Sequence, residues 1–78
     1  MNKEQKYIAT QAIFEALTGG RKLSQMDCRE FEIEDMRTPI SHMKDRFDNA
    51  GFNLHTRWIQ TPKGRRIKEY WLERRVLS

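Results

Sequence analysis

Apolar positions divide the chain into a long helix, two shorter helices and a pair of strands. Residues 3–18 carry an apolar stripe at helical spacing, which is typical of an amphipathic helix. Its members are Tyr7, Ile8, Ala12, Ile13, Ala16 and Leu17. Gly19 and Gly20 follow the stripe and predict its end, because glycine readily adopts the left-handed conformation that terminates helices.

Residues 24–31 are predicted to form a short second helix. Ser24 is placed to be its N-cap, and Asp27, three residues later, completes a weakened capping box. Leu23 and Met26 are expected to face inward.

The segment from residue 38 to residue 50 carries the clearest helical pattern. Thr38 is its predicted N-cap, and Pro39 takes the first helical position, where no backbone N–H is needed. Gly51 follows as the C′ residue. One buried face is predicted from apolar spacings of three and four, formed by Ile40, Met43, Phe47 and Ala50.

Two strands are predicted for the rest, residues 52–60 and 65–73, because aromatic and β-branched residues are concentrated there. Pro62 and Gly64 lie between them at positions that suit a turn. Three helices followed by a two-stranded hairpin predict a single α+β domain of the winged helix-turn-helix class. The hairpin must rest on the helices, because an isolated hairpin is marginally stable in water.

Two alternations of inward-facing and outward-facing residues fit the hairpin. One needs a turn with an odd number of residues, or a bulge, and groups Leu54, Trp58, Tyr70 and Leu72. The other fits an even turn and groups Leu54 and Trp58 with Ile67 and Trp71. A slip of one residue exchanges the two faces. We favour Tyr70 and Leu72 facing inward, which leaves Trp71 partly exposed.

Composition and charge narrow the classes of function. With 78 residues and 37% hydrophobic content, the chain supports one small core and not an enclosed substrate cavity as well, so an enzyme is disfavoured. Residues 1–51 contain 8 Lys and Arg against 9 Asp and Glu, whereas residues 52–78 contain 7 against 2. A cationic segment of this kind is typical of nucleic-acid-binding proteins.

Candidate reactive residues are few. A single cysteine, Cys28, forms no intramolecular disulfide and favours a reducing, cytoplasmic location. His42 and His55 lack metal-ligand partners at suitable spacing, and the glycine pair after the first helix is not a phosphate-binding loop. We therefore expect no catalytic residue, no metal and no cofactor. We also expect no signal peptide and no membrane-spanning segment.

The polar face of the segment 38–50 offers contacts to DNA. In a helix-turn-helix protein the second helix presents its N-terminal residues to base edges in the major groove. Predicted base contacts are Thr38, Ser41, His42 and Asn49, and predicted phosphate contacts are Arg37, Lys44 and Arg46. Asp45 and Asp48 oppose this prediction, because phosphates repel carboxylates. The alternative is a core helix with a mixed solvated face.

Cations also gather at the hairpin turn and along its strands. Predicted phosphate contacts here are Arg57, Lys63, Arg65, Arg66 and Lys68, with only Glu69 and Glu73 as acidic neighbours. The alternative is that these charges are solvated turn residues that protect strand edges from aggregation.

Residues 36–72 resemble the small helix-turn-helix domains of phages and prophages. The matching stretches are "NAGFNLHTRW" and "RRIKEYWL", in which Asn49-Ala50-Gly51 ends the helix, Leu54 and Thr56 lie in the first strand, and Ile67, Tyr70 and Leu72 in the second. The resemblance implies a winged-helix fold and DNA binding by a small regulator or an excisionase-like accessory factor. The sequence departs from that pattern in its helix, where two aspartates and Phe47 replace arginine and leucine.

We therefore expect sequence-specific or architectural binding of double-stranded DNA by a small phage-type transcriptional regulator or recombination accessory factor. A dimer or tandem array is expected, because one such domain contacts little DNA. The main alternative is a winged-helix module that docks on a host protein, such as a phage-encoded inhibitor, which the acidic residues 30–35 favour. RNA binding is a second alternative, although two strands offer a small platform for stacking bases.

Overall fold

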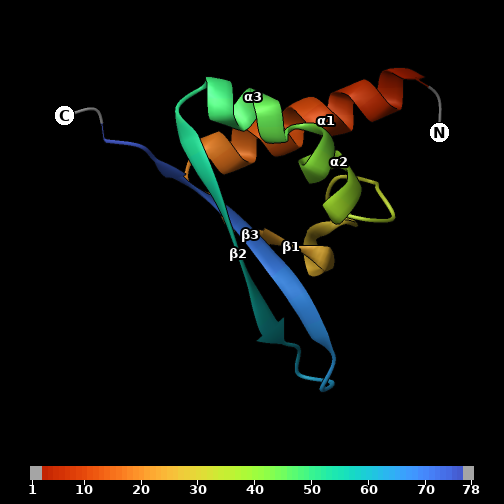
Figure 1. Ribbon diagram of the computed structural model, residues 1–78. Coiled ribbons are helices and arrows are strands. Elements are labelled where there is room, and N and C mark those ends of the chain that lie inside the picture. The colour runs from red at the N-terminus through yellow and green to blue at the C-terminus, as the bar shows by residue number, and fades with distance from the viewer. Residues whose placement is uncertain (1–2, 77–78) are drawn as a thin grey trace.

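The computed structural model describes the backbone of residues 3–76 and the side chains of residues 8–76. It is an α+β fold in which three α-helices lie on one face of a three-stranded antiparallel sheet (Figure 1). The elements in chain order are α1 (Lys3–Thr18), β1 (Leu23–Ser24), the 3-10 turn η1 (Gln25–Asp27), α2 (Arg37–His42), α3 (Lys44–Asn49), β2 (Phe52–Gln60) and β3 (Arg66–Arg74). The strand order is β1-β3-β2.

Helix α1 has the predicted bounds, but its buried stripe is rotated from the predicted one. Ala9, Ile13 and Leu17 face the core, whereas Ile8 is 65% exposed. The side chain of Tyr7 lies outside the described residues. The helix ends at Thr18, and the φ of 97° at Gly20 allows the N–H of the next residue to reach the Ala16 carbonyl at 3.0 Å.

The predicted helix over residues 24–31 is wrong. Ser24 is an N-cap, since its backbone N–H donates to Asp27 at 2.8 Å and its hydroxyl accepts from the Met26 N–H at 3.2 Å. Only the 3-10 turn η1 follows, and Met26 is 63% exposed. A helix of eight residues would form few intrahelical hydrogen bonds, and these would not offset the conformational entropy lost in nucleating it. A series of turns runs through Glu32, a non-glycine residue with a φ of 56°.

The predicted helix over residues 38–50 is divided into α2 and α3 at Met43, which has φ −99° and ψ 4°. Its predicted buried face is confirmed for Ile40, Met43 and Phe47, but Ala50 is exposed. Gly51 follows with a φ of 88°, as expected for the C′ position.

Thr38 is not the N-cap, because the helix begins one residue before it. The Asp35 carboxylate accepts a hydrogen bond from the Arg37 backbone N–H at 3.0 Å and from the Thr38 hydroxyl at 2.6 Å. A carboxylate at this end satisfies a free N–H and opposes the positive end of the helix dipole.

The sheet has three strands, where the sequence predicted a two-stranded hairpin. The additional strand β1 pairs Leu23 with Tyr70 of β3. A strand of two residues has no periodicity, so no pattern in the sequence indicates it.

The β2–β3 hairpin has the register that faces Tyr70 and Leu72 inward, as favoured. Leu54 pairs with Leu72 and Thr56 with Tyr70, and the connecting loop, residues 61–65, has an odd length. Trp71 lies on the opposite face and is half-buried, also as predicted. Figure 1 shows the hairpin extending well past the helices, with its tip as the most remote part of the fold.

The core lies between the helices and the sheet. Its buried side chains come from every layer: Ile13, Leu17, Leu23, Cys28, Met36, Ile40, Met43, Phe47 and Tyr70. The Phe14 and Phe47 rings stack with centroids 5.6 Å apart, which joins α1 to α3. Within residues 3–76, no helix has the length and apolar character needed to cross a membrane.

Candidate nucleic-acid interface

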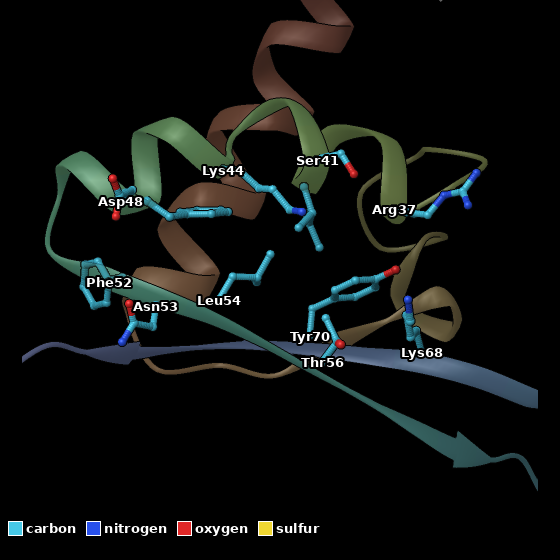
Figure 2. A pocket seen from close by; sticks show the side chains of 12 residues that line it. Arg37, Ser41, Lys44, Asp48, Phe52, Asn53, Leu54, Thr56, Lys68 and Tyr70 are labelled. Atoms are coloured by element: carbon cyan, nitrogen blue, oxygen red, sulfur yellow. The ribbon is translucent and has the colours of Figure 1, made fainter.

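An open groove of about 530 Å³ separates the α2–α3 pair from the β2–β3 hairpin. Arg37, Ser41 and Lys44 line it from the helices, while Thr56 and Lys68 line it from the strands (Figure 2). Its base is apolar and includes Ile40, Phe47, Leu54 and Tyr70. The core therefore supports the groove, and polar side chains form its rim.

The groove is electropositive. Arg37, Lys44 and Lys68 come from three different elements, and within the described side chains none of them pairs with a carboxylate. The only acidic residue in the lining is Asp48, which is bound at 2.8 Å by Arg75. Three cations without carboxylate partners within the described side chains, around one open groove, attract a polyanion.

The position of each cation follows from its element. Arg37 is the first residue of α2 and Lys44 the first residue of α3, and both line the groove on either side of the break at Met43. Lys68 alternates with Tyr70 on the inner face of β3, opposite Trp58 of β2. Figure 2 shows the Lys68 and Tyr70 side chains rising from the strand toward the helices, and Lys44 extending into the space between them.

Two titratable groups at this site have displaced pKa values. Burial raises the pKa of the Tyr70 hydroxyl, so it stays protonated at neutral pH and can donate a hydrogen bond from the side of the groove. The hydrogen bond from Thr38, together with that from the Arg37 backbone, lowers the pKa of Asp35. Asp35 therefore stays ionised and holds the start of α2.

The hairpin tip carries a second group of cations. Lys63, Arg65 and Arg66 are exposed there, and they too lack carboxylate partners within the described side chains. The loop that holds them is closed by hydrogen bonds: the Thr61 N–H donates to the Arg65 carbonyl at 2.8 Å, and the Gly64 N–H to the Thr61 carbonyl at 2.9 Å. Pro62 and Gly64 thus occupy the predicted turn.

The groove does not gather all of the predicted base-contacting residues. Ser41 lines it, but His42 lies exposed outside the described hollows. Thr38 is held by Asp35 and borders a separate hollow beside α1. Asn49 lies near Arg74 and Arg75 at the far end of the hairpin.

Two predicted phosphate contacts lie away from the groove. Arg46 faces α1, with its guanidinium 4.3 Å from the centre of the Phe14 ring and 3.4 Å from Gln11. Arg57 lies on the outer face of the hairpin, paired with Glu69 at 2.7 Å. Both side chains have partners within the protein, and both are directed away from the cations that line the groove.

Sequence reasoning missed several residues of the site. Asn53, Thr56 and Tyr70 line the groove, and Trp58 borders a smaller hollow that continues it. The strand alternation contains the signal for three of them, because Thr56, Trp58 and Tyr70 share the inner face with Leu54. The position of the helices relative to that face is a tertiary property that the pattern does not reveal.

No metal site or reactive thiol accompanies the groove. Within the described part of the chain, no three His, Cys, Asp or Glu residues are grouped to hold a metal ion. Cys28 is buried, and its burial raises the pKa of the thiol, so it remains protonated and unreactive in the folded state.

Comparison with models of protein families, with curated proteins and with solved structures gives no match for this chain.

Proposed function

We propose that the protein binds double-stranded DNA through the groove and the hairpin tip. The observation that carries this proposal is the convergence of Arg37, Lys44 and Lys68, without carboxylate partners within the described side chains, around one open groove. The tip cations extend the same positive surface along the hairpin. Double-stranded DNA is a polyanion that can contact both groups of cations at once, because its backbone carries regularly spaced phosphates.

In this proposal the helices and the hairpin act as a winged helix-turn-helix. The α2–α3 pair takes the role of the recognition helix, with Ser41 and His42 reaching base edges. The β2–β3 hairpin is the wing, whose strand β3 is also paired with β1. The turn η1 and the turns that follow it replace the first helix of the motif, so the approach of α2 is fixed by Asp35 and not by a helix–helix contact.

Phosphate contacts supply most of the expected affinity. Six cations are available: Arg37, Lys44 and Lys68 at the groove, and Lys63, Arg65 and Arg66 at the tip. Each phosphate neutralised contributes about −0.9 to the slope of log K against log salt, so complete engagement predicts a slope of about −5. Binding of this kind suits a small transcriptional regulator or a recombination accessory factor that acts as a dimer or tandem array.

Fluorescence anisotropy of a labelled 20-base-pair duplex, titrated with protein at several salt concentrations, tests the proposal. We expect binding that weakens steeply with salt, and a loss of at least about tenfold in the Arg65→Glu/Arg66→Glu variant, because two attractions become repulsions. No binding at low salt would disprove DNA binding.

A second candidate function is docking on a host protein through the acidic turns between η1 and α2. Glu32 and Glu34 are exposed there, and Glu32 holds a positive φ that a non-glycine residue rarely adopts. The Glu32→Lys/Glu34→Lys variant separates the candidates. It leaves DNA binding intact or improves it if DNA is the ligand, and it abolishes capture of the partner if a protein is.

A further inference from the structure

We propose that Trp58 stacks on a DNA base displaced from its neighbours, so that the preferred ligand is a duplex with an opened or kinked step. This inference rests on the proposed DNA binding and names the kind of DNA. Its starting point is the unusual exposure of Trp58.

Trp58 is the one exposed aromatic side chain among residues 8–76, with 57% of its surface accessible. The other tryptophan, Trp71, lies on the outer face of the same hairpin, stacked on His55 at 5.6 Å between centroids. Trp58 instead lies on the inner face with Thr56 and Tyr70, beyond the edge of the helix layer. The fold thus leaves a large flat ring exposed to solvent on the side that carries the groove.

Two cations flank that ring. The Arg66 guanidinium carbon and the Lys68 amino nitrogen each lie 5.4 Å from its centroid. Lys68 is directly opposite Trp58 in the strand register, and Arg66 is the next residue on that face. Neither forms an ion pair within the described side chains. Both cations lie over the ring, so a base that stacks on Trp58 takes their place there, and they become available to its flanking phosphates.

The hollow beside Trp58 continues the groove. It measures about 220 Å³, and it shares Arg37, Lys68 and Tyr70 with the larger groove. A DNA strand held by the cations of the groove therefore runs toward the ring. Gln25 and Asp35 also line the hollow, but their side chains are held by hydrogen bonds within the protein, so the ring of Trp58 is the feature of the hollow that meets a base.

Stacking on Trp58 selects a weak step and does not open a stable one. The gain from stacking one base on an aromatic ring is similar in size to the cost of unstacking a duplex step. A step that is already weakened, by a mismatch for example, lacks most of that cost. The structure therefore predicts a preference for weakened steps that depends on the Trp58 ring.

The test uses two fluorescein-labelled 20-base-pair duplexes that differ by one central mismatch. We expect wild-type protein to bind the mismatched duplex about tenfold more tightly. Trp58→Ala should remove this preference, and Trp58→Phe, which keeps a ring, should retain part of it. Trp71→Phe is the matched control on the outer face and should keep the full preference. Circular dichroism melting establishes that each variant is folded.

The outcomes separate this inference from the proposed function. Equal binding of both duplexes by wild type, or an undiminished preference in folded Trp58→Ala, would overturn the role of Trp58 and leave DNA binding standing. Failure of wild type to bind either duplex would overturn both. In the Trp71→Phe protein Trp58 is the only tryptophan, so its fluorescence should be quenched by the mismatched duplex. An unchanged signal on binding would also reject stacking.

Discussion

Lys68 and Arg57 have the same formal charge on the same hairpin, but their surroundings differ. Lys68 faces the groove without a carboxylate partner within the described side chains, whereas Arg57 faces the opposite side and is bound to Glu69 at 2.7 Å. A cation already paired within the protein has less to gain from a phosphate. The distinction between available and engaged cations therefore decides which residues belong to the site.

This contrast gives a matched pair of single-charge variants. Lys68→Gln should weaken binding to duplex DNA severalfold and make the slope of log K against log salt less steep by about 0.9, because one phosphate contact is lost. Arg57→Gln should change both quantities little. Anisotropy titrations at four salt concentrations measure each slope. Equal losses in the two variants would show that overall charge, and not the groove, attracts DNA.

At the scale of elements, the start of α2 depends on Asp35. Its carboxylate joins the Arg37 backbone N–H to the Thr38 hydroxyl, and these hydrogen bonds lower its pKa below the ordinary value of 3.8. Because the folded pKa is the lower one, this stabilisation is present above pH 3.8 and is lost as the pH falls through the folded value. The start of α2, which positions Arg37 and Ser41, is therefore least stable at acidic pH.

Asp35→Asn tests that dependence. The amide keeps one oxygen acceptor and loses the negative charge, so we expect the variant to be about 1 kcal/mol less stable at pH 7. The difference from wild type should begin to shrink as the pH falls below about 4, where the carboxyl of the unfolded chain takes up a proton, and should be lost as the pH falls through the lowered pKa of the folded state. Urea unfolding followed by circular dichroism between pH 2.5 and 7 measures both curves. A difference that stays constant with pH would contradict the role of the charge.

The elements also show what the sequence alone could predict. The hairpin was predicted well because alternation, Pro62 and Gly64 agree with one another, and its inner face was recovered from Tyr70 and Leu72. The second helix was predicted wrongly, because the capping box of Ser24 and Asp27 is a local feature that supports a single turn as readily as a helix. The break at Met43 and the pairing of β1 with β3 depend on tertiary contacts, which leave no periodic signal.

The candidate site likewise combines features that the sequence reveals with features that depend on tertiary structure. The sequence identified the cations of the groove and the tip, since charge is a property of composition. It did not distinguish Lys68 from Arg57, because the face of the hairpin on which each side chain lies depends on the strand register. It placed Trp58 on the buried face of the hairpin in both alternations, but Trp58 is 57% exposed on that face, because the hairpin extends beyond the helices (Figure 1).

At the scale of the whole molecule, the fold is thin, with principal extents of 43 × 32 × 17 Å. A single small core therefore supports both the groove and the projecting hairpin. Cys28 belongs to that core, together with Ile13, Leu23 and Tyr70. Its thiol is shielded as long as the helices remain on the sheet, so it reports on the integrity of the whole fold.

Thiol labelling should therefore follow global unfolding. Cys28 is 7% exposed, and burial raises the pKa of its thiol, so we expect slow reaction with a maleimide in native buffer. The labelled fraction should rise with urea along the same curve as the loss of circular dichroism, because the buried cluster that covers Cys28 comes from all layers of the fold and is lost when the domain unfolds cooperatively. Labelling well below the urea transition would instead show that residues 25–36 detach from the sheet independently. The Cys28→Ser variant, which cannot be labelled, provides the background for the measurement. If duplex DNA binds the folded state, adding it should shift both curves to higher urea together, since a ligand specific to the native state stabilises the entire molecule.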